Sequence, residues 1–232
     1  MNTTHRFALM IAGLALALDL NGSLANALGQ APAGPPAPGR GGRAAAPAPD
    51  PTRPALLEIG EGTKARYRVR EQLAGISFPS DAVGTTEAVT GTVVVNPDGS
   101  IDAERSKITV DLDTLESDQQ MRDGYVKGRT LETETYPTLE FVPRRAVGLA
   151  APLPSSGQAG FQLVGDMTLH GVTKEATWDV VATFGNAQVA GRATTTLRFE
   201  TFNMAKPSLA RLLSVGDEIV LEIEFRCGRT AL

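Results

Sequence analysis

Residue types that perform catalysis or hold metals are scarce in this chain of 232 residues. It contains two histidines, His5 and His170, and one cysteine, Cys227. Zinc sites take about three or four Cys, His or carboxylate ligands at set spacing, so no metal centre is expected. A Ser-His-Asp hydrolase would need His170 as its base. The chain has no Gly-x-Ser-x-Gly elbow for such a serine, and the hydrolase stays only as an alternative.

The remaining polar candidates favour structural roles. Asp111 and Asp113 fall on the same face of an expected strand, opposite apolar neighbours, so they are predicted on a solvated face. Arg122-Asp123 lies in an expected helix beside Met121, which is predicted to be buried. Pairing or capping explains this dipeptide better than ligand contact. No phosphate loop or dinucleotide fingerprint is present, and no cofactor is expected.

Alternating hydrophobicity predicts the elements that position these residues. Apolar and polar side chains alternate over residues 108–112, 176–184 and 219–225, which is typical of antiparallel strands with one polar face. A short helix is predicted over Asp118–Lys127, capped by Ser117 or Asp118, and a second helical piece near Pro207–Leu213. Glycine-containing turn signals separate the strands, namely Asn96-Pro97-Asp98-Gly99, His170-Gly171, Gly185-Asn186 and Val215-Gly216-Asp217. This pattern predicts an all-β sandwich or barrel.

The apolar strand positions are the strongest functional lead. In a small barrel they either fill the interior or line a cavity for one ligand, and alternation leaves both open. The candidate lining residues are Leu112, Phe141, Phe161, Leu163, Met167, Leu169, Trp178, Val180, Leu197, Phe199, Leu221 and Phe225.

The N-terminal region is predicted to lie outside the folded domain. Residues 1–27 have the form of a secretory signal, with Arg6, an apolar run Phe7–Leu18 and cleavage expected after Ala25 or Ala27. Its twelve apolar residues are fewer than the ~20 that span a bilayer. Residues 28–54 are rich in Ala, Pro and Gly and predict a disordered linker, which leaves 55–232 for one domain.

Charge and cysteine content exclude further classes. The formal net charge is −4, without the basic face of a nucleic-acid binder. Cys227 has no internal disulfide partner and is interpreted as a small buried hydrophobe. Pairing between two copies, and hence a homodimer, stays open.

Four motifs carry a family resemblance in order and spacing: Arg122-Asp123, Tyr136-Pro137-Thr138-Leu139-Glu140-Phe141, the run Gly165–Lys174, and Val215-Gly216-Asp217-Glu218-Ile219. Over about residues 65–227 the chain resembles the YceI-like family of exported, lipocalin-like proteins. The resemblance implies an eight-stranded antiparallel barrel with one or two short helices and a long apolar channel. It also implies a periplasmic protein that sequesters or transports a polyisoprenoid, such as a quinone or prenyl lipid, without catalysis.

Two segments depart from the family pattern. Residues 73–80 lack the usual histidine and contain Pro79, and residues 127–131 are basic where a Phe-Phe pair is usual. Both are expected near the mouth of the cavity, so the ligand can differ from the typical one. A packed barrel that binds a protein partner and no ligand stays as the alternative.

Overall fold

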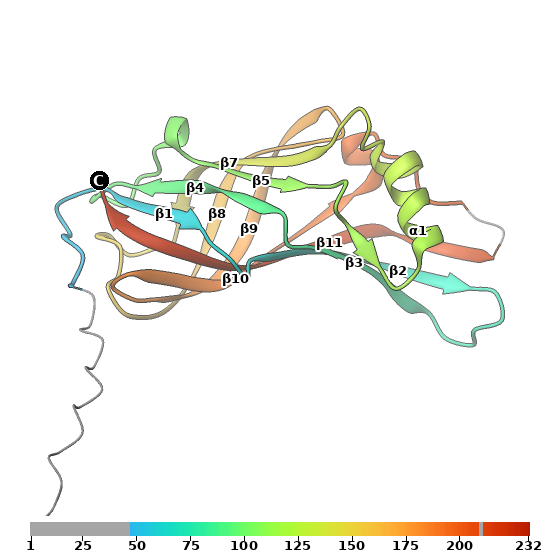
Figure 1. The fold of residues 1–232 in the computed structure, drawn as a ribbon, viewed down its shortest axis with the longest axis horizontal. Coiled ribbons are helices and arrows are strands. Elements are labelled where there is room, and N and C mark those ends of the chain that lie inside the picture. Colours follow the sequence, from blue (N-terminus) through green and yellow to red (C-terminus); the bar gives the residue numbers. More distant parts are fainter. Residues whose placement is uncertain (1–46, 209–210) are drawn as a thin grey trace, which may run out of the picture. The chain divides into compact units, whose positions relative to one another are not determined.

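The computed structural model of the protein describes residues 47–208 and 211–232. The expected signal at 1–27 and residues 28–46 of the expected linker lie outside the described residues. The described part is mostly β-structure (Figure 1). Its strands are β1 (Ala55–Ile59), β2 (Lys64–Leu73), β3 (Ser80–Thr86), β4 (Val89–Val95), β5 (Lys107–Asp111), β6 (Glu116–Ser117), β7 (Thr138–Val147), β8 (Gly157–Leu169), β9 (Val172–Phe184), β10 (Gln188–Arg198) and β11 (Leu212–Ala231).

Eight of these strands close into an antiparallel barrel. The order is β1-β4-β5-β7-β8-β9-β10-β11, and a further pairing of β11 with β1 completes the ring. Closure pairs Ala55 with Ala231 and Ile59 with Cys227. The predicted eight-stranded barrel is therefore confirmed.

The last strand is the longest and joins both ends of the ring. Strand β11 has 20 residues, and one of its edges pairs with β10 from Glu218 to Gly228. Its other edge pairs first with β2 and then with β1. Strands β2, β3 and β6 continue beyond the closed ring at one end of the barrel, where the helix also lies (Figure 1).

The helical segments differ in part from the prediction. Helix α1 (Gln120–Tyr125) runs into a π-helical turn, η2 (Val126–Leu131), so a helix is present where expected but continues further. Its N-cap is Gln119, without a side-chain cap, so the predicted cap at Ser117 or Asp118 is wrong. The helical piece predicted near Pro207–Leu213 is not present in its described part, because β11 already begins at Leu212, and residues 209–210 of that prediction lie outside the described residues. Two 3-10 turns form elsewhere, η1 at Ala103–Arg105 and η3 at Phe199–Phe202.

The turn signals are confirmed with one exception. His170 and Gly171 have φ of 50° and 71° and connect β8 to β9, as a type I′ hairpin turn requires. Val215-Gly216-Asp217 does not open the last strand, because it lies inside β11 at an irregularity in the pairing with β2. The bulge absorbs the extra residues and bends the strand.

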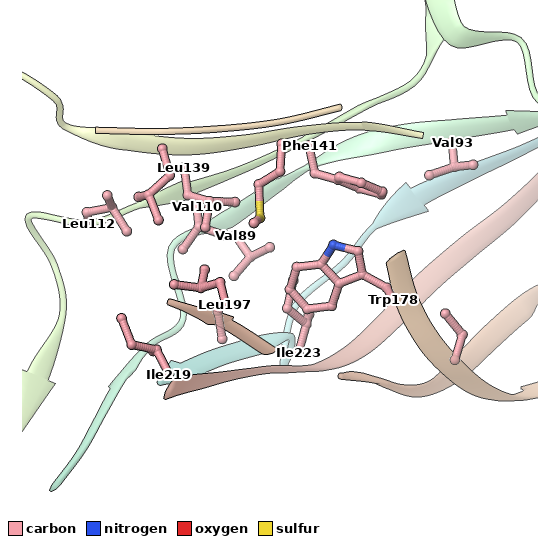
Figure 2. Close-up of a cluster of buried hydrophobic side chains, with 14 of the residues drawn as sticks. Val89, Val93, Val110, Leu112, Leu139, Phe141, Trp178, Leu197, Ile219 and Ile223 are labelled. Atoms are coloured by element: carbon pink, nitrogen blue, oxygen red, sulfur yellow. The ribbon is translucent and has the colours of Figure 1, made fainter. Parts of the chain in front are cut away.

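Alternation places the apolar side chains in one continuous core. Figure 2 shows Leu139 of β7 and Trp178 of β9 projecting into the same interior as Ile223 of β11. Aromatic rings meet there, with Phe141 and Trp178 centroids 6.0 Å apart.

Gly165 of the family motif is required by backbone packing. A Cβ at this position would overlap the Val142 carbonyl oxygen and lie 2.7 Å from the Pro143 Cα, and the strand backbone cannot yield. We expect Gly165→Ala to lower the free energy of unfolding by about 1–3 kcal/mol. Gly124→Ala, in α1 with open space around it, should instead raise it by about 0.5–1 kcal/mol. Urea unfolding of both variants measures these changes. Changes of the same sign in the free energy of unfolding would contradict the prediction.

Candidate functional site: a row of apolar cavities

The barrel interior is hollow in three places. The inner cavity has a volume of about 100 Å³, and all residues that line it are apolar apart from the Cys227 thiol and the Trp178 indole N–H. The middle cavity has about 50 Å³, and the helix-side cavity about 550 Å³. An apolar cavity such as the inner one stays dry and accepts apolar ligands.

Shared side chains show that the three cavities form a row. Trp178 and Ile223 line both the inner and the middle cavity. Tyr67 and Leu221 line both the middle and the helix-side cavity. Leu139 lines all three. A chain-like apolar ligand entering from the helix side would therefore pass Leu139 to reach the inner cavity.

The structure places eleven of the twelve predicted lining residues around this row, and their contact with a ligand stays a prediction. Around the inner or middle cavity lie Phe141, Phe161, Leu163, Trp178, Val180 and Phe225, and around the helix-side cavity lie Leu112, Leu169, Leu197, Phe199 and Leu221. Met167 is the exception, because it is buried in the core but lines none of the three cavities.

Several lining residues were not among the predicted set. Leu139 shares a strand face with Phe141, two residues away, so alternation along β7 carries a signal for it. Tyr67 and Glu71 come from β2, where they alternate with Arg66, Arg68 and Arg70, so alternation carries a signal for them as well.

An ion-pair cluster stands at the helix-side cavity. Arg122 of α1 donates to Glu71 of β2 over 2.8 Å, and their side chains are only 13% and 9% exposed. Arg122 also pairs with Asp118, one turn earlier. Asp123 accepts a hydrogen bond from the Ser117 backbone N–H. The structural interpretation of Arg122-Asp123 fits these contacts, although Arg122 also lines the cavity. Met121, predicted to be buried, is 83% exposed, because α1 turns this side chain outward.

The Tyr67 ring lies over a glycine on the neighbouring strand, which leaves room for it beside this cluster. A Cβ on Gly84 of β3, its cross-strand partner, would overlap the Tyr67 ring. Burial raises the pKa of Tyr67 to about 12. The phenol therefore stays protonated at neutral pH and remains a hydrogen-bond donor.

Three residues that line the cavities carry a buried polar atom without a hydrogen-bond partner among the described residues. The atoms are Arg66 Nε at the middle cavity, the Trp178 indole Nε1 at the inner and middle cavities, and the Thr130 hydroxyl at the helix-side cavity. An unpaired buried polar group costs about 1–3 kcal/mol, which a ligand atom of matching polarity would recover.

The opposite end of the barrel is closed by a loop. Leu149 and Leu153 of the β7–β8 connection line the inner cavity. Arg229 of β11 is buried and donates to the carbonyl oxygens of Leu153, at 3.2 Å, and Pro154. Burial lowers the pKa of Arg229. These bonds hold the loop over the end of the inner cavity.

The candidates for polar chemistry do not assemble into a catalytic site in the described part of the chain. His170 Nδ1 lies 3.1 Å from the Phe202 carbonyl oxygen, and its ring packs edge-on against Tyr136. Asp111 accepts from the Asp113 backbone N–H. Asp113 lies beyond β5 and binds the Thr133 hydroxyl, so the prediction that both share a strand face is wrong. Within residues 47–208 and 211–232, no group of three His, Cys, Asp or Glu side chains is arranged to hold a metal ion.

The free energy of unfolding should fall at alkaline pH, because two weakly acidic side chains are buried in the folded protein. Burial raises the pKa of the Cys227 thiol from 9.0 to about 12, and that of Tyr67 from 10.0 to about 12. For both groups the pKa in the folded state lies above that in the unfolded state. Their contribution to the free energy of unfolding is therefore complete below about pH 9 and is lost as the pH rises toward 12. We expect the urea midpoint to fall over this window.

The variant Cys227→Ala/Tyr67→Phe isolates these two groups, since it should flatten the alkaline decline in the urea midpoint. We also expect native Cys227 to resist alkylation at neutral pH and to react once the protein is unfolded. An unchanged alkaline slope in the double variant would contradict this assignment.

The family of the chain follows from its sequence. Residues 61–227 match the model of the YceI-like domain. The chain belongs to the YceI-like family. Curated relatives include a UPF0312 protein of Pseudomonas putida strain W619, 32% identical over 171 residues that cover 66% of this chain and 83% of the relative. The corresponding protein of strain GB-1 is 31% identical over the same shares.

Solved structures share the fold of this YceI-like domain at low identity. A polyisoprenoid binding domain from Saccharophagus degradans superposes with a TM-score of 0.59 at 10% identity, covering 75% of this chain and 98% of the other. BcnA of Burkholderia cenocepacia gives 0.53 at 17% identity, with coverages of 71% and 95%. A YCEI protein of Campylobacter jejuni gives 0.51 at 14% identity, with coverages of 68% and 90%.

Proposed function

We propose that the chain binds a long-chain apolar lipid of the polyisoprenoid class inside its barrel and sequesters or transports it, without a covalent step. The observation that carries this proposal is the row of apolar cavities joined at Leu139. A linear chain matches a row of narrow cavities better than a compact ligand does. The Saccharophagus degradans domain of the same fold is a polyisoprenoid binding domain, which supports this ligand class.

The polar groups favour a ligand orientation. The helix-side cavity contains Arg122, Tyr67 and the unpaired Thr130 hydroxyl, whereas the inner cavity is apolar and closed by the loop. The head of the lipid therefore belongs at the helix side and its tail toward Trp178. Burial of the tail supplies the affinity, at ~25 cal/mol per Å² before ordering costs.

The same groups favour an uncharged head that carries oxygen. Arg122 already contacts two carboxylates, Glu71 and Asp118. Among the described residues this leaves Arg211 as the single unpaired cation of the lining, which is too little charge to neutralise a diphosphate. The protonated Tyr67 phenol and the Thr130 hydroxyl are neutral hydrogen-bonding groups. A quinone or a phenol with a prenyl tail satisfies them best.

The proposed setting is the periplasm, and it rests on the signal-like residues 1–27. Within the described residues, no helix is long and apolar enough to cross a membrane. A carrier in this setting would take its ligand from one lipid phase and release it to another.

Native mass spectrometry of the protein purified from its own host, followed by organic extraction, tests the proposal. We expect a bound species that solvent releases and that is identified as an isoprenoid lipid. An apo mass, together with no uptake of added quinones or prenyl lipids, would reject lipid binding and favour the packed interaction module.

A further inference from the structure

We propose that the end of the barrel beside α1 docks on the surface of a phospholipid bilayer, with four apolar side chains inserted around the cavity mouth. The role of this docking, delivery or uptake of a lipid, rests on the proposed function. The exposed apolar surface itself is a feature of the structure and does not depend on that function. The four residues, called the rim below, are Ile76, Phe78, Met121 and Leu213.

The rim concentrates exposed apolar surface at one end. Among the described residues seven large hydrophobic side chains are exposed, and four of them form the rim. Phe78 is 79% exposed, Met121 83%, Leu213 66% and Ile76 50%. Contiguous exposed apolar groups mark interaction sites on soluble proteins.

Backbone pairing brings these residues together. The Ala74 N–H donates to the Arg211 carbonyl over 2.8 Å, and Leu73 pairs with Leu212. The β2–β3 hairpin with Ile76 and Phe78 therefore lies beside the start of β11. Helix α1 lies at the same end of the barrel (Figure 1).

The rim is continuous with the cavity. Met121 lines the helix-side cavity while it is exposed, and so do Leu73 and Leu212, which adjoin the hairpin and Leu213. An apolar ligand moving along these side chains would leave the cavity directly onto the rim. If the rim is docked on a bilayer, the ligand passes from the cavity into lipid without crossing water. A lipid surface is therefore the partner that best matches the rim.

Charge at this end is complementary to anionic lipid headgroups. Lys127 and Arg129 follow α1, and Arg211 precedes β11. None of the three forms an ion pair with another described residue. The acidic side chains Asp81 and Asp118 are already paired, with Arg70 and Arg122 respectively. Each basic side chain near an anionic surface raises the association constant for the membrane by about tenfold or less.

Two sequence segments supply part of this end. Residues 73–80 contain Ile76 and Phe78 of the rim, and residues 127–131 contain Lys127 and Arg129, whereas Met121 and Leu213 lie outside both segments.

Sedimentation with vesicles of phosphatidylethanolamine and phosphatidylglycerol tests the docking of the full chain. We expect Ile76→Ser/Phe78→Ser, called the rim variant below, to weaken vesicle binding by about tenfold or more, because two inserted side chains are lost. Both residues are exposed and neither lines the helix-side cavity. The control Val147→Ser/Val181→Ser removes two exposed valines of β7 and β9 outside the rim, and it should bind as the unaltered protein does. Binding should also weaken with added salt and without phosphatidylglycerol.

Equal binding by the rim variant and the control would overturn the proposal. So would a rim variant that changes the mass of the particle in light scattering, because the rim would then join two copies of this chain.

A second readout separates this inference from lipid binding itself. Prenyl quinone is added either from cyclodextrin or from vesicles, and emission of Trp178, the single tryptophan, reports its arrival. We expect the rim variant to match the unaltered protein from cyclodextrin and to load more slowly from vesicles. If Trp178 emission does not change with quinone from either source while vesicle binding is intact, the proposed function is rejected and the docking surface is still supported. Equal loading rates from vesicles would reject the docking route alone.

Discussion

Leu139→Phe is expected to separate the inner cavity from the helix side, so that lipids with long prenyl tails bind about tenfold or more weakly. Leu139 lines all three cavities, so a larger ring at this position would extend into the space between them. Lipids with short tails fit within the helix-side cavity and should keep their affinity. Overpacking should cost about 1–3 kcal/mol of stability. Titration monitored by Trp178 emission, with short- and long-tailed quinones, measures both affinities.

Leu169→Phe is the matched control for this prediction. Leu169 is also buried but lines only the helix-side cavity, which has about 550 Å³. The same change of side chain there should affect short and long tails alike. A Leu139→Phe variant that weakens both ligands equally would show that the tail does not pass this junction.

Removing the Arg122 side chain should produce the largest loss of stability. Arg122→Met leaves Glu71 without its cation in a site where the carboxylate side chain is 9% exposed. Breaking a buried pair in this way costs about 3–5 kcal/mol. Asp118, the second partner, is 73% exposed and can be hydrated. Urea unfolding measures the change.

Two further variants show whether burial of the pair is the cause. Arg122→Met/Glu71→Leu removes both charges and should recover most of the loss, since a packed apolar pair replaces buried ions well. Arg144→Met breaks a pair with Asp166 whose side chains are 56% and 35% exposed, and it should cost about 1 kcal/mol or less. Similar losses in Arg122→Met and Arg144→Met would contradict a buried role for Glu71.

The ring of strands was predictable because its signals are local. Alternation at Trp178 and Phe225 depends on neighbours two residues away, and His170-Gly171 specifies its turn through two positive φ values. The same alternation extends from Phe141 to Leu139, so the junction of the cavities was within reach of the sequence.

What the sequence did not predict depends on contacts between distant segments. Arg122 and Glu71 are 51 positions apart. Alternation with Tyr67 and Val69 places Glu71 on the inward face of β2, but nothing in the sequence identifies Arg122 as its partner. Met121 was expected in the core because it is apolar, but a helix of six residues turns it outward. The Val215-Gly216-Asp217 segment has turn composition, yet β2 pairs with β11 before and after it, and β10 pairs with β11 directly after it, which holds the segment within the strand.

The pairing of β11 also governs the order in which the molecule can assemble. Strands β1 and β2 each pair on one edge with an early strand, β4 and β3 respectively, but their other edges pair with the last strand, β11. The Leu232 N–H also donates to the Pro54 carbonyl over 2.9 Å. Contacts between the two ends of a chain form late and slow its folding. A nascent chain without its final 20-residue strand cannot close the ring, because β11 is the strand that joins β10 to β1.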